Sequence, residues 1–175
     1  AGGIETFMVT PDKDFGQLIS EHSVMWKPGR RGNEHEIVDL SALCELWEIE
    51  HPDQVIDILG LMGDKSDNIP GIPGVGEKTA RKLVAEWGSV ENLLENTGAL
   101  KGKLKERVIE NADQARLSKE LATIMKDVPV EQSIEDLALQ ERDDEAVKSI
   151  FTEFEFNALG RRLFGKEFVA GRGQT

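Results

Sequence analysis

The fold of this chain is decided by residues 69–83, which read IPGIPGVGEKTARKL. Gly74 and Gly76 lie two positions apart, and a residue without a Cβ permits positive φ and the close approach of another backbone. The residues from Glu77 onward favour a helix, whose first free amides would point outward and attract an anion. Lys78, one turn inside that helix, adds a mobile positive charge. The stretch therefore predicts a tight glycine loop followed by a helix start that can hold a phosphate.

This loop pattern is typical of a helix-hairpin-helix motif, with apolar and glycine residues alternating before three polar residues and the small Ala80. Such a hairpin contacts the DNA backbone and not the bases, because its donors reach phosphate oxygens. The alternative is a glycine-rich turn that only joins two packed helices. A nucleotide-binding loop of the Walker type is excluded, because no Gly-Lys-Ser/Thr occurs at the required spacing. The candidate DNA-binding residues are Gly74, Val75, Gly76, Lys78, Thr79, Arg81 and Lys82.

Four carboxylates precede this hairpin in the sequence. Asp12 and Asp14 follow a short apolar strand, and we expect Lys13 between them to be solvated, the alternative being that it reaches a phosphate. Asp64 and Asp67 are predicted at the end of a helix, where their i, i+3 spacing places them on one face. Carboxylate oxygens are the ligands that hard divalent cations prefer, and two such cations about 4 Å apart can assist phosphodiester hydrolysis. The alternative is that each pair only caps a helix or a turn.

The charge of the chain is unevenly distributed. The formal net charge is −12, from 21 basic and 33 acidic residues, which argues against a uniformly basic surface for nucleic acid. Residues 131–155 contain nine acids and two bases and carry −7, whereas residues 71–82 carry +2 and residues 101–107 carry +3. We expect the acidic stretch to be a solvated face turned away from DNA, and the two basic stretches to contact it.

Apolar residues spaced i, i+3, i+4, i+7 recur along the chain and predict helices with buried stripes. Pro52 suits the first position of the helix that carries the first stripe. Short strands are expected at residues 5–10, 22–27 and 34–38, with a basic, turn-rich connection at 28–33. The predicted fold class is mostly α with a few short N-terminal strands. Three stripes have this spacing, namely Val55-Ile58-Leu59-Met62, Ala80-Leu83-Val84-Trp87 and Val147-Ile150-Phe151-Phe154, and a similar stripe is Leu117-Leu121-Ile124-Val128.

Composition also limits the class of protein. The chain has one cysteine, so no intrachain disulfide can form, and a cytoplasmic location is expected. No run approaches the ~20 apolar residues of a membrane span, and nothing at the N-terminus is typical of a signal peptide. Aromatic residues make up 6% and tyrosine is absent, which disfavours a base-stacking platform for single strands.

Three segments together resemble the 5′→3′ exonuclease domain of bacterial DNA polymerase I, in a family that includes phage and eukaryotic flap endonucleases. They are residues 10–14 (TPDKD), 61–71 (LMGDKSDNIPG) and 74–80 (GVGEKTA). The similarity continues to residues 156–160 (FNALG), where the nuclease domain of the family ends. The resemblance implies that this chain is the C-terminal half of an α/β 5′-nuclease domain, with a helix-hairpin-helix subdomain in a three-helix variant.

The resemblance also implies an activity and its partners. The family hydrolyses phosphodiesters by a two-metal mechanism on duplex DNA with a 5′ flap, nick or end, and residues 74–76 with Lys78 would bind the duplex backbone. A K⁺ ion can be held by backbone carbonyls of that loop. The resemblance further implies that the protein is a monomer and that a polymerase module is present in the parent chain. It also implies a role in DNA replication and repair in the cytoplasm, at the nucleoid. The implied catalytic and metal-binding residues, for Mg²⁺ or Mn²⁺, are Asp12, Asp14, Asp64 and Asp67.

The family pattern places further metal ligands and a helical arch upstream of the first strand of this chain. We therefore expect these 175 residues alone to lack a complete active site. The alternative function is a non-catalytic module that binds duplex DNA without sequence preference. The expected divisions are residues 1–50 in the α/β core, 51–130 in the helix-hairpin-helix subdomain, 131–168 in C-terminal helices that pack back on the core, and 169–175 in a tail.

Overall fold

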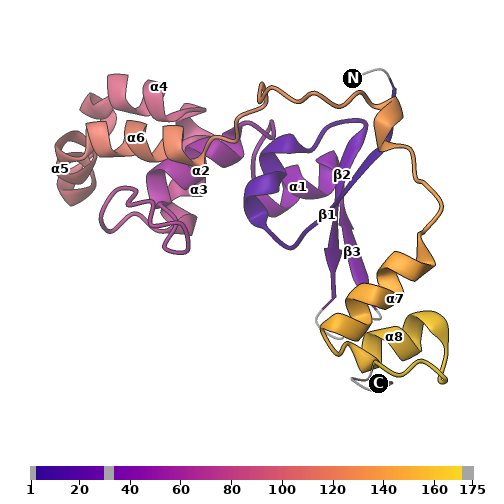
Figure 1. Cartoon of the computed structure of the whole chain (residues 1–175). Helices are drawn as coiled ribbons and strands as arrows, with labels where there is room; N and C mark the ends of the chain where they lie inside the picture. The colour runs from indigo at the N-terminus through magenta and orange to yellow at the C-terminus, as the bar shows by residue number, and fades with distance from the viewer. Residues whose placement is uncertain (1–2, 30–33, 171–175) are drawn as a thin grey trace. The chain divides into compact units, whose positions relative to one another are not determined.

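The structure is a computed structural model that describes residues 3–29 and 34–170. It divides into two units, with the boundary between Asp127 and Val128. Within the first unit (Figure 1), the elements are β1 (Thr6–Val9), the 3₁₀ helix η1 (Lys13–Leu18), β2 (Ser23–Pro28), β3 (His35–Val38), α1 (Leu40–Trp47), α2 (Gln54–Met62), α3 (Glu77–Trp87), α4 (Val90–Glu95), η2 (Thr97–Ala99), α5 (Gly102–Glu110) and α6 (Ala112–Ala122). Those of the second unit are η3 (Glu135–Leu137), α7 (Asp144–Glu153) and α8 (Asn157–Phe164).

The first unit opens with a three-stranded sheet. β2 lies in the centre, parallel to β1 and antiparallel to β3. Met25 of β2 is opposite Met8 on one side and Val38 on the other. Met25 and Val38 are each 1% exposed, so this face of the sheet is buried. The three predicted strands and the fold class are confirmed, while residues 30–33 of the expected basic turn lie outside the described residues.

The turn before α2 differs from the sequence prediction. Pro52 is predicted at the first helical position, but α2 begins at Gln54, and the Pro52 carbonyl accepts the amide of Val55 at 3.0 Å. The side-chain oxygen of Gln54 accepts the amides of Glu50 and His51, at 2.8 and 3.1 Å. A proline, which has no N–H, fits this preceding turn as well as it fits a helix start, and Gln54 stabilises the turn.

α2 is the central helix of the first unit. Its residues 55–61 are all buried, because it contacts η1, α3, α4 and α6. Asp57 is the charged residue among them, and its Oδ1 accepts the amide of Val90 at 2.8 Å and pairs with Lys119 Nζ at 2.6 Å. Lys119 Nζ also lies 2.6 Å from a carboxylate oxygen of Glu91. This network joins α2, α4 and α6, and it gives the buried carboxylate its partners.

α6 buries a different stripe from the one predicted. Leu117 and Leu121 are 51% and 57% exposed, whereas Ala115, Ser118 and Ala122 are buried. The prediction that the leucines form the core is therefore wrong.

Close packing of α6 on α2 explains the difference. A Cβ added at Gly60 of α2 would lie 2.8 Å from the Cβ of Lys119, so the two backbones approach to a distance that only small residues tolerate. The larger apolar residues of α6 consequently lie on its other side. Val128, the last member of the predicted stripe, is also exposed.

η1 is fixed to the end of α6 by the buried side chain of Gln17. Its Nε2 donates to the carbonyl of Ala122, and its Oε1 accepts the amide of Ile124, both at 2.9 Å. Both polar ends of a side chain that is removed from water are thereby satisfied. The segment that carries Asp14 is held in place by this contact, although Gln17 and Ile124 are far apart in the sequence.

The second unit contains two short helices joined by aromatic side chains. The ring of Phe151 in α7 packs edge-on against three others, with centroid distances of 5.9, 6.1 and 6.2 Å to Phe156, Phe164 and Phe168. Edge-on pairs at such distances are favourable, so Phe151 is the centre of this small cluster.

The stripe predicted at residues 147–154 is only partly buried. Val147 and Phe151 are half-buried, whereas Ile150 and Phe154 are exposed. Among the described residues, no helix combines the length and the apolar character that crossing a membrane requires.

Candidate functional site

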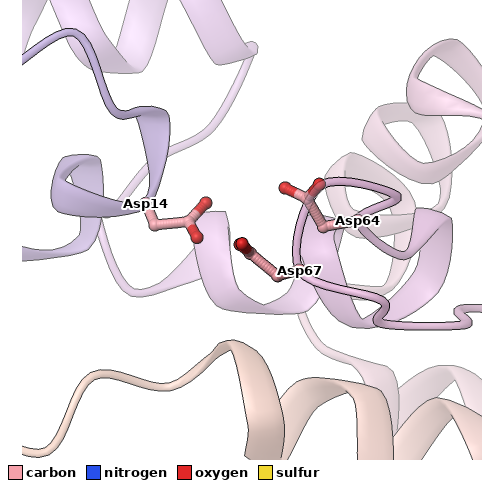
Figure 2. A group of neighbouring side chains, drawn as sticks. All are labelled: Asp14, Asp64 and Asp67. Carbon is pink, nitrogen blue, oxygen red and sulfur yellow. The ribbon is translucent and has the colours of Figure 1, made fainter.

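Three carboxylates from two segments that are distant in sequence meet in the first unit. Asp14 lies in η1, whereas Asp64 and Asp67 lie in the turn after α2. One oxygen atom from each lies within 4.8 Å of the other two. Figure 2 shows the three side chains converging from the two segments. The structure thus brings together three of the four carboxylates that the sequence predicts for a metal site, and we call these three the carboxylate trio.

Asp64 and Asp67 do not lie on a helix, contrary to the sequence prediction. The chain leaves the helical conformation at Gly63, where φ is +72°. The amide of Asp64 then donates to the carbonyl of Ile69 at 2.9 Å, and the amide of Ile69 donates to the carbonyl of Asp64 at 2.7 Å. The amide of Ser66 donates to Asp64 Oδ1 at 2.8 Å. A tight turn, and not a helix face, therefore places the two carboxylates together.

Asp12 lies beside the trio but is not one of its members. Its Oδ1 accepts the amide of Asp14 at 3.1 Å and so caps η1. Its own amide donates to Thr10 Oγ1, also at 3.1 Å. Its Oδ2 accepts no hydrogen bond from the part of the chain that the structure describes, so one oxygen remains available to a ligand.

Lys13 belongs to the same cluster, and it is both partly solvated, as expected, and paired with a carboxylate, which the sequence does not predict. Its Nζ donates a hydrogen bond to Asp64 Oδ2 and lies 3.7 Å from Asp14 Oδ1. The sequence signal is a lysine between two aspartates at the start of a short helix. That signal does not identify the partner, because Asp64 is 51 positions further along the chain.

The pKa values of the two carboxyl groups beside Lys13 are shifted in opposite directions. The hydrogen bond from Lys13 lowers the pKa of Asp64 below its ordinary value and outweighs the effect of burial. Burial raises the pKa of Asp14, and the neighbouring carboxylates add to this rise while Lys13 opposes it. Burial alone would lower the pKa of Lys13, but its hydrogen bond to Asp64 and the nearby carboxylates raise it. A cation near Asp14 would therefore stabilise its charged form.

The trio fits a hard divalent cation. Its donors are all carboxylate oxygens, which Mg²⁺ and related ions prefer. Asp14 Oδ1 is buried and accepts no hydrogen bond from any described residue. A buried oxygen without a hydrogen bond costs free energy, and a cation at this position would satisfy it. Asp14, Asp64 and Asp67 are thus the residues that could hold such an ion.

The glycine loop begins by crossing the end of α2. Gly71 has φ +60°, and a Cβ there would collide with the backbone of Met62 and Gly63. The amide of Ile72 donates to the carbonyl of Leu61 at 2.8 Å. Glycine is therefore needed at position 71 for its conformation and for the available space.

Two side chains of α6 hold the same part of the loop. Ser118 Oγ accepts the amide of Gly71 at 3.0 Å, and Gln114 Nε2 donates to its carbonyl at 2.5 Å. Ser118 is buried, so its hydroxyl is a fixed partner for the loop backbone. The predicted hairpin is consequently attached to α6 as well as to its two flanking helices.

α3 begins at Glu77, as the sequence predicts, and Gly76 is its N-cap. The carbonyl of Gly76 accepts the amides of Thr79 and Ala80, both at 2.9 Å. The amides of Gly76, Glu77 and Lys78 donate to none of the described residues. Free amides at a helix start carry partial positive charge and bind anions, so the loop offers three donors beside the exposed lysine.

Two of the candidate DNA-binding residues are engaged in packing. Val75 is buried in the core. Arg81 NH1 donates to the carbonyl of Leu46 at 2.5 Å, NH2 is hydrogen-bonded to Glu77, and the guanidinium lies 5.3 Å from the ring centroid of Trp47. Arg81 therefore attaches α3 to α1, and the lysines at positions 78 and 82 of the same helix remain exposed.

Arg107 of α5 extends the basic surface to the loop. A Cβ at Gly74 would collide with its guanidinium, so the two residues are in direct contact. Arg107 is exposed and lies in the second basic stretch, residues 101–107. The sequence predicts two separate basic stretches, and the structure joins them at this point.

The sequence of this chain is similar to those of known proteins. The chain matches the family described as 5′-3′ exonuclease, C-terminal SAM fold, over residues 50–145. It is 43% identical over 162 residues to DNA polymerase I of Bacillus caldotenax, 44% identical over 162 residues to that of Bacillus subtilis, and 38% identical over 157 residues to the thermostable DNA polymerase I of Thermus aquaticus. These alignments cover 92%, 92% and 90% of this chain, which spans 18% of the length of each relative.

Solved structures share the fold at lower identity. A mutant of the phage T5 5′-exonuclease has a TM-score of 0.58 at 19% identity, over 67% of this chain and 47% of its own. The phage T5 flap endonuclease, in a pseudo-enzyme–product complex with DNA and metal ions, has a TM-score of 0.59 at 19% identity, over 67% and 42%. The catalytic core of Rad2 in complex with a DNA substrate has a TM-score of 0.50 at 15% identity, over 83% and 50%.

Proposed function

This chain belongs to the 5′-3′ exonuclease family of nucleases, and from that premise we propose that it supplies metal-site carboxylates and a duplex grip to a structure-dependent 5′→3′ exonuclease or flap endonuclease. One observation carries the proposal. Two members of the carboxylate trio, Asp64 and Asp67, belong to one continuous segment with the glycine loop, because the turn that carries them leads directly to Gly71. A metal-dependent nuclease needs such a link, because the scissile phosphate must be placed by a DNA contact made nearby.

The metal site in this proposal is built on Asp14, Asp64 and Asp67, with the free Oδ2 of Asp12 as a fourth donor. Bound Mg²⁺ or Mn²⁺ supplies Lewis-acid activation of water and charge stabilisation in phosphodiester hydrolysis by a two-metal mechanism. The turn at Asp64 and the cap of η1 hold the oxygens in place before an ion arrives. The trio and Asp12 together provide four carboxylates, which are too few for a complete two-metal site. We therefore propose that further ligands come from elsewhere in the parent protein and that this chain alone is inactive.

The duplex grip consists of the loop and the exposed cations around it. Gly74, Gly76 and Thr79 shape the loop and the helix start, and Lys78, Lys82 and Arg107 would contact phosphates. Backbone contacts of this kind carry no sequence information, so binding is expected to be independent of sequence. Val75 and Arg81 contribute by holding the hairpin in shape, since their side chains are engaged with the core and with α1.

A K⁺ ion at the loop is part of the proposal. The carbonyls of Pro73, Gly74 and Val75 accept no hydrogen bond from any residue that the structure describes. Backbone carbonyls are suitable ligands for a monovalent cation, and a cation there would lie beside the three free amides and the phosphate that they bind.

The proposed organisation follows the expected divisions, with an α/β core in residues 1–50, the DNA-binding subdomain in residues 51–130 and helices that pack back on the core in residues 131–168. By analogy with the relatives, which are DNA polymerase I, we propose that the parent protein carries a polymerase module. A monomeric state is a further part of the proposal. Its substrate would be duplex DNA with a 5′ flap, nick or end, during replication and repair in the cytoplasm.

The DNA grip can be tested by fluorescence anisotropy with a labelled 5′-flap duplex at increasing salt. Binding should be weak and steeply salt-dependent, and Lys78→Ala should reduce the slope of log K against log salt by about one unit. Lys148→Ala, which removes a lysine of α7, is the control and should leave the slope unchanged. Absence of binding at low salt, or an unchanged slope in Lys78→Ala, would contradict the grip.

A cleavage assay on the same duplex with Mg²⁺ separates the two candidate functions. The nuclease proposal predicts that divalent cations bind to the chain and that Asp67→Ala weakens this binding, although the chain alone does not cleave. Cleavage that Asp67→Ala abolishes would show that the chain is active by itself. If the chain binds DNA but divalent cations and the Asp67→Ala substitution do not change that binding, the non-catalytic duplex-binding module is favoured.

A further inference from the structure

Lys13 places a positive charge where a divalent cation would have to bind. Its Nζ is hydrogen-bonded to Asp64 and lies 3.7 Å from Asp14 Oδ1, which has no other cationic neighbour among the described residues. Without this ammonium, three carboxylates would have oxygens within 4.8 Å of one another and no opposite charge among them. Like charges at such distances repel, so the cluster needs a cation to keep its geometry.

We propose that Lys13 is an internal counter-ion of the carboxylate trio, which holds the cluster together in the absence of a divalent cation and is displaced when one binds. The inference rests on the metal site of the proposed function and adds to it a residue that competes with the metal. Lys13 is a positioning residue in this account, because it acts through the carboxylates.

The backbone of Lys13 is fixed while its side chain is free to move. The cap by Asp12 and the buried contacts of Gln17 hold η1 on either side of it. The Lys13 side chain itself is 39% exposed, so the ammonium has a path to solvent. A lysine has a flexible four-carbon stem, and the ammonium can leave the cluster without any movement of the aspartates.

Charge determines the direction of the exchange. The trio carries three negative charges, of which Lys13 neutralises one and a divalent cation would neutralise two. A monovalent ion would gain no charge over the ammonium that it replaces. Competition with Lys13 therefore favours divalent over monovalent cations. It also makes the binding free energy of a divalent cation less favourable, by the free energy of the Lys13 ion pair that is lost.

The test compares Mn²⁺ binding by the whole chain and by three variants, measured by electron paramagnetic resonance of free Mn²⁺. Lys13→Met should bind Mn²⁺ more tightly, on the order of tenfold, because the competing charge is gone. Lys65→Met removes a charge from an exposed lysine of the same turn, and should change the affinity by no more than about two- to threefold through screened, longer-range repulsion. Lys13→Arg keeps the charge and should bind like the wild type.

Thermal unfolding in EDTA gives a readout that is independent of affinity. Lys13→Met should have a lower midpoint than the wild type in EDTA, and the difference should close with saturating Mn²⁺. Should Lys13→Met fail to fold without metal, recovery of its helical circular dichroism on adding Mn²⁺ would equally support the proposal.

The outcomes distinguish this inference from the proposed function. Equal Mn²⁺ affinity in the wild type, Lys13→Met and Lys65→Met would overturn the role of Lys13 and leave the metal site in place. Weaker binding by Lys13→Met would also overturn it, because Lys13 would then assist the metal and not compete with it. If no variant binds Mn²⁺, both the inference and the metal site of the proposed function are wrong.

Discussion

The guanidinium of Arg107 lies against Gly74, so that α5 and the glycine loop form one basic surface. Gly74 has φ +79°, and a Cβ at this position would occupy the space of the guanidinium. Gly76, two positions later, has φ −99° and nothing within 4 Å of an added Cβ. The two glycines of the hairpin therefore have different physical roles, although the sequence presents them alike.

Gly74→Ala should lose both stability and DNA affinity. The left-handed conformation costs a residue with a Cβ about 1–2 kcal/mol, and the displaced Arg107 would no longer be held at the loop. Urea unfolding and anisotropy with a duplex would measure the two losses. Gly76→Ala is the matched control for stability and should unfold close to the wild type, because nothing lies within 4 Å of an added Cβ there, and a loss of stability as large as that of Gly74→Ala would refute the distinction.

Ser118→Val should destabilise the first unit by about 1–3 kcal/mol, because the amide of Gly71 would be left buried without its acceptor. The midpoint of urea unfolding at constant slope is the appropriate measure. The exposed Ser133 provides the comparison, since among the described residues its side chain is hydrogen-bonded to Asp136 alone. Ser133→Ala should change the unfolding free energy by less than about 0.5 kcal/mol.

Lys119→Met should destabilise the chain by about 2–4 kcal/mol at neutral pH, because the buried Asp57 would lose its cationic partner. Lys126→Met removes the exposed lysine 3.8 Å from Asp53, and should cost less than about 1 kcal/mol. If the two variants lose the same free energy of unfolding, burial of Asp57 does not make its ion pair more stabilising than the exposed one.

The same network predicts a loss of stability at alkaline pH. Burial alone would lower the pKa of Lys119, but its hydrogen bonds to Asp57 and Glu91 outweigh burial and raise the pKa above the ordinary 10.5. A raised pKa means that the stabilisation is complete below pH 10.5 and is lost as the pH rises through the higher folded-state value. The difference in unfolding free energy between the wild type and Lys119→Met should therefore be constant from pH 7 to 10 and decrease above 10.5.

Arg81→Met and Lys82→Met should separate packing from DNA contact. Arg81 is hydrogen-bonded to the carbonyl of Leu46 and lies over Trp47, so its loss should cost about 1–2 kcal/mol of stability. Lys82 is exposed, and its loss should leave stability unchanged while the salt slope of DNA binding falls by about one unit. If Arg81→Met lowers the salt slope and Lys82→Met lowers the stability instead, the phosphate contact is made by Arg81.

Asp14→Asn should weaken Mn²⁺ binding more than Asp12→Asn does. Asp14 contributes an oxygen to the trio, and the loss of a charged ligand should reduce affinity on the order of tenfold or more. An asparagine at position 12 keeps the oxygen that caps η1, so the fold of this segment is retained. Titration with Mn²⁺ checks the order, and a larger effect at position 12 would show that Asp12 is the more important ligand.

The elements themselves could be predicted from the sequence, because they depend on local properties. Short runs of apolar residues close to turn-forming residues mark the strands, and the glycine loop before Glu77 marks the start of α3. The resemblance in residues 61–71 and 74–80 was sufficient to identify the family. The predicted leucine stripe of α6 failed for a non-local reason, since the approach of α6 to Gly60 selects small residues.

The order of the elements, the family and the candidate carboxylates can therefore be predicted without a structure, because each follows from residues close together in the chain. Which charges meet depends instead on the packing of segments that are distant in the sequence. Lys13 pairs with Asp64, Arg107 reaches the glycine loop at Gly74, and Arg81 is held against α1. A charged side chain has the same local pattern whether it faces solvent, a carboxylate or a phosphate, and its partner is fixed by packing between segments that the sequence does not place side by side.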